Sequence, residues 1–288
     1  MPIQKFSFGW IPDYPDIRNY SDTHEKIKPI VSRLAAARDE AIPKKVDLRQ
    51  WCSGVENQGK IGSCTANSVA GIVEYFENKA FGKHIEVSRL FLYKVSRNLL
   101  HTEGDKGAFL KTAIGALTLF GVPPEEYWPY VENSFDDEPN AFCYSFAQNY
   151  KCINYFSHSA NGAKPEEVLQ SVKKYLASGI PSVFGFTVYS SIEAATKVGC
   201  IPFPNEKEKF LGGHAVGAYG YDDKKKIENP YTGESTTGAL LIRNSWGEEW
   251  GDKGYGWLPY EFVLRGLALD FWSLVKQEWV DAEAFFSK

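Results

Sequence analysis

The sequence lacks the features that mark several large classes of protein. No stretch approaches the ~18 uninterrupted apolar residues of a membrane-spanning helix, and the first ten residues contain no apolar core of signal-peptide length. A net charge of −4 provides no general basic field that would favour nucleic acid. We therefore expect a monomer with no membrane and no nucleic-acid partner. It would be cytoplasmic by default, although export without a cleaved signal stays open.

Metal-binding patterns are absent as well. The five cysteines and five histidines form no Cys-x-x-Cys pair and no pair of closely spaced histidines, the spacings that are typical of zinc sites. The Gly-x-Ser-x-Gly elbow of many serine hydrolases is also missing. We therefore expect no metal and no cofactor. Four cysteines are interpreted as buried thiols, although two disulfides would also fit their number: Cys52, Cys143, Cys152 and Cys200.

Cys64 lies where an apolar stretch with helical periodicity begins. Four apolar residues follow it at helical spacing, namely Val69, Ile72, Val73 and Phe76. The pattern predicts a helix that begins near Cys64 and ends near Gly82. A cysteine at a helix N-terminus experiences the positive end of the peptide dipoles, which favours the thiolate. Because the thiolate is the nucleophilic form, we predict that Cys64 is a catalytic nucleophile.

The remaining apolar patterns divide the chain into two halves of different character. The first half contains predicted helices over 87–100 and 109–120, followed by a predicted linker with an exposed acidic patch over 128–143. The second half begins with a helix from Pro165 and then becomes rich in β-structure. Its predicted strands cover 180–188, 214–221, 239–244, 255–258 and 271–275.

His214 and Asn244 are candidate partners for the thiol. His214 follows two glycines and opens an apolar strand, so ordered backbone would hold its ring while its N-terminal side stays open. Asn244 ends a predicted strand, and two tryptophans among four glycines follow it, which is unusual for a plain turn. We interpret the other histidines as surface residues: His24, His84, His101 and His158.

Three motifs together resemble the papain-like cysteine peptidases. They are the stretch from Gln58 to Ala66, the triplet His214-Ala215-Val216, and the run from Asn244 to Gly256, and they occur in the family order of cysteine, histidine and asparagine. The run Asn-Ser-Trp-Gly-x-x-Trp-Gly-x-x-Gly-Tyr is highly specific. The resemblance implies an α+β fold of two lobes, in which a helical left lobe faces an antiparallel, β-barrel-like right lobe across the active cleft.

The resemblance also implies a role for each of four side chains. Cys64, with a lowered pKa, attacks the scissile carbonyl and forms a thioester. His214 protonates the leaving amine and then activates water, and Asn244 orients its ring. Gln58 donates a hydrogen bond to the developing oxyanion, together with the backbone N–H of Cys64. The resemblance therefore predicts a cysteine endopeptidase with a Cys-His-Asn triad, acting on peptide or protein substrates.

Four residues are candidates for substrate binding: Gly104, Gly107, Gly213 and Trp246. Gly104 and Gly107 match a glycine-bearing edge of the family loosely, whereas Gly213 precedes His214 directly. The sequence departs from the family at two places near the thiol. Thr65 replaces the usual aromatic residue, and Ile61 stands where many secreted members have a disulfide cysteine. These departures indicate a divergent, microbial-type member. Since every catalytic side chain is present, we expect it to be active.

Residues 1–44 differ from the catalytic domain that we expect at 45–288. Their proline- and aspartate-punctuated part predicts an extended strip laid on the surface, followed by a short helix from Pro29. We expect the helical lobe at about 60–145 and the β lobe at about 146–288. The strip is either a packing arm or a regulatory pro-segment, as in a zymogen, that partly inhibits the enzyme.

Two rival functions remain open at this point. One is a different thioester acyl transfer, as in a deamidase, a transglutaminase-like enzyme or a deconjugating enzyme. The other is a peptide-binding module that has lost turnover. Free peptide fragments would identify proteolysis, and reaction with an electrophilic peptide would separate an enzyme from a binder.

Overall fold

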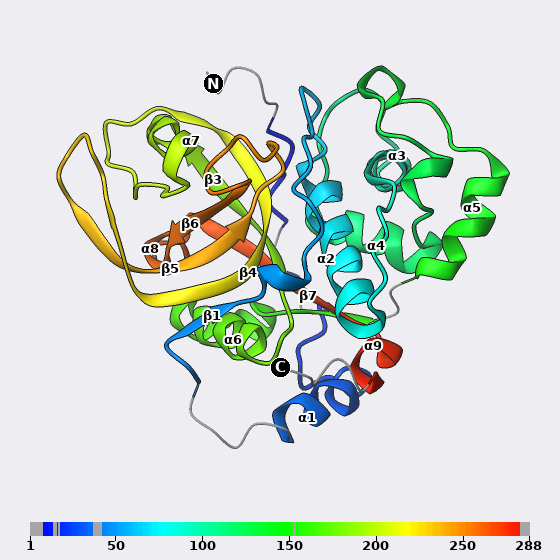
Figure 1. Cartoon of the computed structure of the whole chain (residues 1–288), viewed down its shortest axis with the longest axis horizontal. Coiled ribbons are helices and arrows are strands. Elements are labelled where there is room, and N and C mark those ends of the chain that lie inside the picture. The colour runs from blue at the N-terminus through cyan, green and yellow to red at the C-terminus, as the bar shows by residue number, and fades with distance from the viewer. Residues whose placement is uncertain (1–7, 14–15, 17, 37–41, 152–153, 283–288) are drawn as a thin grey trace.

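The computed structural model describes residues 8–13, 16, 18–36, 42–151 and 154–282. Helices gather on one side of the molecule and a β-sheet on the other, so the chain forms two lobes (Figure 1). This arrangement confirms the predicted α+β class. No helix in these ranges is long and apolar enough to cross a membrane.

The helical lobe is built around α2 (Cys64–Phe81), whose bounds confirm the prediction. Gly82 ends this helix in the left-handed conformation, with φ of 63°, which glycine adopts without steric cost. The lobe also contains α3 (Arg89–Leu99), α4 (Leu110–Phe120) and α5 (Ala141–Ala147). Helix α3 begins after Ser88, whose side chain accepts a hydrogen bond from the Phe91 N–H.

The segment over 128–143 is more ordered than the predicted linker. Helix α5 begins inside it, because the Asn140 side chain accepts a hydrogen bond from the Cys143 N–H at 3.0 Å and so caps the helix. Asp136 forms an ion pair with Arg97, whose side chain is fully buried. Part of the acidic stretch therefore holds the lobe together instead of only facing water.

The β lobe is an antiparallel sheet of seven strands in the described residues. The strands are β1 (Lys45–Asp47), β2 (Asn154–Ser157), β3 (Ser182–Tyr189), β4 (Phe210–Glu228), β5 (Ser235–Arg243), β6 (Tyr255–Pro259) and β7 (Ala268–Val275). Their order is β2-β7-β3-β4-β5-β6, with β1 paired to β4. Within the described residues the sheet is open and not a closed barrel, because its outer strands β2 and β6 do not pair with each other.

The remaining helices cover the sheet or lie at the base of the molecule (Figure 1). They are α1 (Lys28–Ala36), α6 (Pro165–Ala177), α7 (Ala195–Val198), α8 (Tyr260–Leu264) and α9 (Gln277–Asp281). Short 3-10 helices occur at Arg49–Trp51, Glu125–Tyr127, Glu132–Ser134, Gln148–Tyr150, Ala160–Gly162 and Ser190–Ala194. Helix α1 packs on α9, so the arm that the sequence predicts and the C-terminal segment meet at the base.

Helix α2 also joins the two lobes. It packs against β4, and the Tyr75 hydroxyl donates a hydrogen bond to the Gly179 carbonyl at 2.8 Å. The Tyr75 ring meets the Tyr219 ring edge to face at 5.6 Å. Because α2 begins at Cys64 and lies against the strand that carries His214, this contact fixes the thiol relative to the imidazole.

Four cysteines are free thiols: Cys52, Cys64, Cys143 and Cys200. Cys143 is buried as predicted, whereas Cys52 and Cys200 are only partly buried. The prediction for Cys152 lies outside the described residues.

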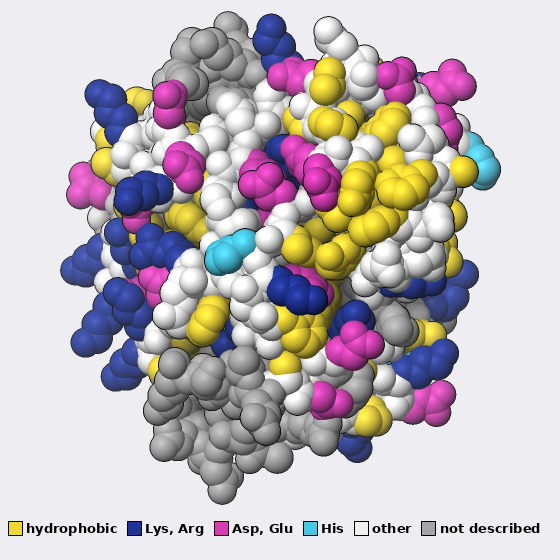
Figure 2. Space-filling model, turned by 45° about the vertical axis from the view of Figure 1, so that its right-hand side comes forward, with side chains coloured by type: hydrophobic (Ala, Val, Ile, Leu, Met, Phe, Trp, Pro, Cys, Tyr) yellow, Lys and Arg dark blue, Asp and Glu magenta, His cyan; other side chains and the backbone are white. Residues whose placement is uncertain are grey.

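A hydrophobic surface lies on the helical lobe. Tyr127 and Phe142 are exposed there, and their rings contact each other and that of Phe146. Figure 2 shows hydrophobic side chains gathered on this side of the molecule, and lysine and arginine side chains along the opposite edge.

Candidate active site

Cys64 is the first residue of α2 and is completely buried. Burial raises the pKa of its thiol to about 11, and the backbone N–H groups of Ala215 and Gly9 act in the opposite direction. The pKa of Cys64 is thus raised, whereas the sequence predicted that it would be lowered. The physical reason is that the thiol is shielded from water, so that the charged form loses its hydration.

His214 is held by Asn244 in one tautomer. The Nε2 atom of His214 lies 2.8 Å from Oδ1 of Asn244. An amide oxygen only accepts hydrogen bonds, so Nε2 carries the proton. The other ring nitrogen, Nδ1, is buried and has no hydrogen-bond partner among the described residues. His214 therefore presents an unshared electron pair at Nδ1, as a general base requires.

Trp246 covers the imidazole. Its ring stacks on that of His214 with centroids 4.6 Å apart and an angle of 25° between the planes. Burial lowers the pKa of His214 to about 4, which the hydrogen bond to Asn244 partly opposes. With the cleft covered, the thiol and the imidazole are therefore both neutral near pH 7.

Gln58 lies beside Ser245, the residue that follows Asn244, and is fully buried. Its Oε1 accepts a hydrogen bond from the Ser245 hydroxyl at 2.6 Å, and its Nε2 donates to the Ile61 carbonyl at 3.0 Å. Ser245 therefore fixes the Gln58 amide in one orientation.

A segment of the N-terminal arm lies across the cleft. The N–H of Trp10 donates to the Gly213 carbonyl at 3.2 Å, and Gly9 accepts from the N–H of Ala108 at 2.9 Å. A Cβ on Gly9 would overlap the Gly62 carbonyl, so the backbones meet closely next to Cys64. This segment runs between the two lobes (Figure 1) and covers the thiol and the imidazole.

Phe8 contacts His214 and Trp246 from the same segment. Its ring meets those of His214 and Trp246 edge to face, with centroids 6.2 Å apart in both cases. Phe8 thus occupies the space directly beside the imidazole.

The predicted substrate-binding residues do not all lie in the cleft. Gly213 and Trp246 line it, and Gly107 approaches Gly9 so closely that a Cβ there would overlap the Gly9 carbonyl. Gly104 lies away from this segment: its N–H donates to Asp136 and its carbonyl accepts from Arg97. The structure therefore joins three of the four predicted residues in one place.

Several residues of the site carry no specific signal in the sequence. Ala108 pairs with the arm, and Phe8 and Trp10 fill the cleft. Asp270 accepts hydrogen bonds from Trp10 and from the N–H of Asp13. The one available signal for Asp270 is an acidic residue inside the otherwise largely apolar strand β7.

His158 is a buried residue, so its interpretation as a surface residue was wrong. Its two ring nitrogens lie 2.8 Å from the Ser171 hydroxyl and 2.9 Å from the Ser273 hydroxyl. Burial lowers the pKa of His158 to about 3. Its surroundings come from a distant helix and a distant strand, which the local polar sequence does not reveal.

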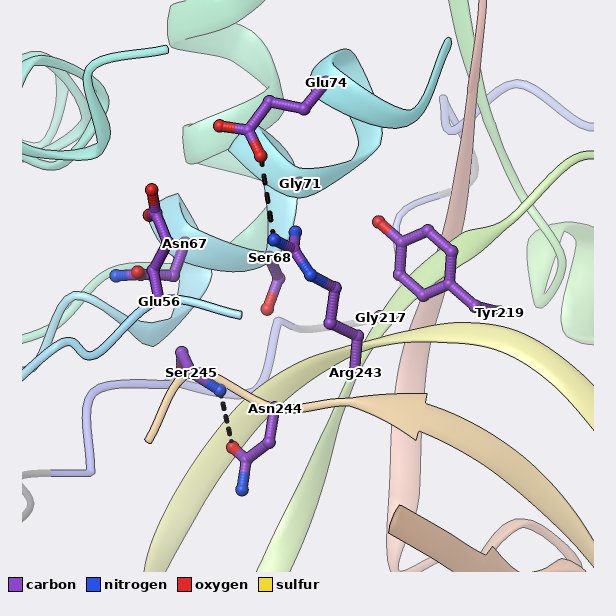
Figure 3. Close-up of a pocket in the computed structure, with 10 residues that line it drawn as sticks. All are labelled: Glu56, Asn67, Ser68, Gly71, Glu74, Gly217, Tyr219, Arg243, Asn244 and Ser245. Atoms are coloured by element: carbon purple, nitrogen blue, oxygen red, sulfur yellow. Dashed lines mark hydrogen bonds and ion pairs between the residues drawn. The ribbon is translucent and has the colours of Figure 1, made fainter. Parts of the chain in front are cut away.

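A small polar cavity lies behind Asn244, between α2 and β5 (Figure 3). Arg243 extends from β5 towards Glu74 on α2, with 3.7 Å between Nη2 and Oε2, and both side chains are buried. The Tyr219 hydroxyl and Nε of Arg243 have no hydrogen-bond partner in the described chain. Arg243, which directly precedes Asn244, thus forms a buried ion pair with Glu74 that connects the two lobes.

No group of three or more His, Cys, Asp or Glu side chains in the described ranges is arranged to hold a metal ion.

Known proteins are similar to this chain in sequence and in fold. The sequence model of the papain family cysteine proteases matches residues 42–262. An uncharacterized peptidase C1-like protein of Acanthamoeba polyphaga mimivirus is 32% identical over 279 residues, which are 92% of this chain and 86% of that protein. Chymopapain of Carica papaya is 26% identical over 74% of this chain, which spans only 54% of chymopapain.

The crystal structure of xylellain, a cysteine protease from Xylella fastidiosa, has a TM-score of 0.76 at 35% identity, with 95% of this chain and 97% of that chain covered. A digestive procathepsin L 3 of Tenebrio molitor shares the fold at a TM-score of 0.61 and 19% identity. The chain belongs to the papain family of cysteine proteases and is a hydrolase of that family.

Proposed function

We propose that the protein is an endopeptidase in which Cys64, His214 and Asn244 act as the catalytic triad. The observation that carries this proposal is the hydrogen bond from Nε2 of His214 to Asn244, because it leaves Nδ1 buried and ready to accept a proton. The Ala215 N–H, adjacent to this histidine, acts on the Cys64 thiol. The base and the nucleophile therefore belong to one site.

The proton and electron movements follow from this geometry. Nδ1 of His214 takes the proton of Cys64, and the thiolate attacks the scissile carbonyl to form a tetrahedral oxyanion. Nε2 of Gln58 and the Cys64 N–H donate to that oxygen. The imidazolium then protonates the leaving amine, which leaves a thioester. Water, deprotonated by the same ring, hydrolyses the thioester and regenerates the thiol.

The arm is the second part of the proposal: residues 8–11 inhibit the enzyme by occupying the cleft. Two observations support this role. Cys64 and His214 have no exposed surface while the arm is in place. The Gly9 group that acts on the thiol is an N–H donor, not a carbonyl carbon that the sulfur could attack. The arm therefore occludes the site without being a good substrate. When the arm leaves, water reaches Cys64 and His214 and stabilises their charged forms, the thiolate and the imidazolium.

The test uses the full-length chain with Phe8→Ala and Trp10→Ala, which removes two rings from the cleft and leaves the rest of the arm. We expect at least about tenfold faster hydrolysis of a short peptide library than with wild type, since the loss of each ring removes apolar contacts worth about 1 kcal/mol or more. Equal rates in a folded variant would contradict inhibition by the arm.

The variant with Phe8→Ala and Trp10→Ala is called the opened chain. Adding Cys64→Ala to the opened chain tests whether Cys64 is the nucleophile. We expect loss of hydrolysis to background, with Cys200→Ala as a matched control at a partly buried thiol elsewhere in the chain. Mass spectrometry of the products distinguishes the rivals: peptide fragments identify proteolysis, whereas an intact peptide with released ammonia identifies deamidation. An opened chain that binds peptides but reacts with no electrophilic peptide would be a binding module.

A further inference from the structure

A tyrosine from a distant segment connects both ends of the turn that leads from Gln58 to Cys64. The Tyr130 hydroxyl donates a hydrogen bond to the Gln58 carbonyl at 2.8 Å and lies 2.6 Å from the Ser63 hydroxyl. Burial raises the pKa of Tyr130 to about 12, so the phenol keeps its proton at neutral pH. Because that single proton goes to the Gln58 carbonyl, the Ser63 hydroxyl donates to Tyr130.

Asn67, on the first turn of α2, continues this chain of hydrogen bonds. Its Nδ2 donates to the Ser63 hydroxyl and to the Ser63 carbonyl, at 3.0 Å in both cases. The backbone N–H of Asn67 donates to the same carbonyl at 3.0 Å. The Ser63 carbonyl and the Cys64 N–H belong to one peptide plane. The two bonds to the carbonyl therefore fix the direction of the Cys64 N–H, one of the two oxyanion donors in the proposed mechanism.

Arg89, the first residue of α3, orients both the amide and the phenol. Its Nη1 donates to Oδ1 of Asn67 at 3.3 Å, which directs the Nδ2 of that amide towards the serine. Its guanidinium also lies over the face of the Tyr130 ring, 4.1 Å from the centroid. Ion pairs with Glu56 and Glu125 hold Arg89 in place. One buried cation thus sets the direction of the whole chain of donors.

We propose that Tyr130 is a positioning residue that keeps the Gln58 side chain and the Cys64 N–H at the spacing that the oxyanion requires. This inference rests on the proposed function, because it concerns the oxyanion donors of the same site. Without the phenol O–H, Asn67 still holds the peptide plane of Cys64, whereas the Gln58 carbonyl loses its donor. The expected defect is therefore a shift of Gln58 relative to Cys64.

The first test is Tyr130→Phe in the opened chain, which keeps the ring beneath Arg89 and removes only the hydroxyl. We expect kcat to fall about tenfold, a part of what the loss of a whole oxyanion donor costs. KM should stay within about twofold, since the oxyanion exists only after the attack. Tyr144→Phe is the matched control, because it removes a hydroxyl that donates to Glu138 at 2.6 Å in the same lobe. An unchanged kcat in Tyr130→Phe overturns the proposal.

A double-mutant cycle with Gln58→Ala separates positioning from a general loss of order. Once the Gln58 amide is gone, Tyr130 has no side-chain donor to position. Adding Tyr130→Phe to Gln58→Ala should therefore lower kcat by less than about twofold. The same fold loss with and without the Gln58 amide overturns the proposal.

Alkylation of Cys64 by iodoacetamide supplies a further readout, because the thiolate displaces iodide and no oxyanion forms. The rates of the opened chain with and without Tyr130→Phe should agree within about twofold. A loss of alkylation as large as the loss of hydrolysis would show that Tyr130 supports the structure as a whole, and would overturn the proposal.

A peptide aldehyde decides the proposal without turnover. The Cys64 sulfur adds to the aldehyde carbon and the thiol proton passes to the carbonyl oxygen, so the hemithioacetal oxygen lies where the oxyanion would. We expect Tyr130→Phe to raise the Kd of the aldehyde about tenfold in the opened chain. Equal Kd values overturn the proposal. If the opened chain hydrolyses no peptide, the proposed function fails, and the aldehyde still tests the role of Tyr130.

Discussion

At the scale of single residues, Gln58 is the group whose role is best isolated by mutation. Its Oε1 is held by Ser245 and its Nε2 by the Ile61 carbonyl, so a change at Nε2 alone leaves half of the anchoring in place. We predict that Gln58→Glu lowers kcat by about 10²–10³-fold in the opened chain, because it removes one oxyanion donor. The measurement is steady-state hydrolysis.

KM should change much less than kcat, since the lost hydrogen bond forms chiefly in the transition state. Ser245→Ala is the companion variant. It keeps the Gln58 amide and removes only the hydrogen bond from the Ser245 hydroxyl to Oε1 of Gln58, so kcat should fall less than in Gln58→Glu. Full activity of Gln58→Glu would show that the Gln58 amide does not bind the oxyanion.

Individual side chains differ in how well the sequence predicts them. The helix start at Cys64 is a local pattern, and the structure confirms it. His158 and Asp270 are defined by contacts with distant segments, so no local pattern revealed their surroundings. The neutral state of Cys64 was not predictable either, because it depends on a segment more than fifty residues away along the chain.

At the scale of elements, the short helix α9 anchors the base of α2. The Trp279 ring stacks on Phe76 with centroids 4.5 Å apart, and its Nε1 donates to Glu77 at 2.9 Å. We predict that Trp279→Ala lowers the free energy of unfolding by about 3–5 kcal/mol, because it leaves a cavity the size of an indole. Urea unfolding followed by circular dichroism measures this change.

The control for this element is Trp279→Phe, which retains a stacked ring and loses the hydrogen bond. Trp279→Phe should lower the free energy of unfolding clearly less than Trp279→Ala does. If both variants were as stable as wild type, α9 would not contribute to the stability of the lobe.

The ion pair between Glu74 and Arg243 connects α2 with β5. Both side chains are almost completely buried, so removal of either one leaves an uncompensated charge. We predict that Arg243→Met destabilises the protein by about 3–5 kcal/mol in urea unfolding. The double variant Arg243→Met with Glu74→Leu should recover a large part of this loss. A double variant less stable than Arg243→Met alone would refute the argument.

Elements were easier to predict from the sequence than their packing. The apolar period of α2 and its terminal glycine gave bounds that the structure confirms, and β3, β4, β5, β6 and β7 lie where strands were expected. The short strands β1 and β2 and the helix α5 were not predicted as elements. They are held by partners far away in the chain, such as β4 for β1 and β7 for β2.

At the scale of the whole molecule, buried histidines make stability depend on pH. The pKa of His158 is about 3 in the folded state, against an ordinary value of 6.5. Between these values the unfolded chain binds a proton and the folded chain does not. The free energy of unfolding therefore falls as the pH drops from about 6.5 to about 3, by up to about 1.4 kcal/mol per pH unit.

We predict that His158→Gln reduces this slope by up to about 1.4 kcal/mol per pH unit, measured by urea unfolding at a series of pH values. His214 contributes in the same direction, since its folded-state pKa is about 4. The exposed His84, changed to Gln, serves as the control. An unchanged slope in His158→Gln would mean that this ring is protonated in the folded protein.

The arm that fills the cleft is part of the same chain, and this has a consequence for how the enzyme responds to concentration. A tethered segment faces its site at a fixed local concentration, on the order of millimolar for a short flexible connection, whatever the amount of protein in solution. Dilution cannot release it, and a substrate must compete with that constant local supply. Opening of the arm should therefore give a lag in hydrolysis whose length is the same at every enzyme concentration, whereas cleavage of one copy by another would shorten the lag as the enzyme is concentrated.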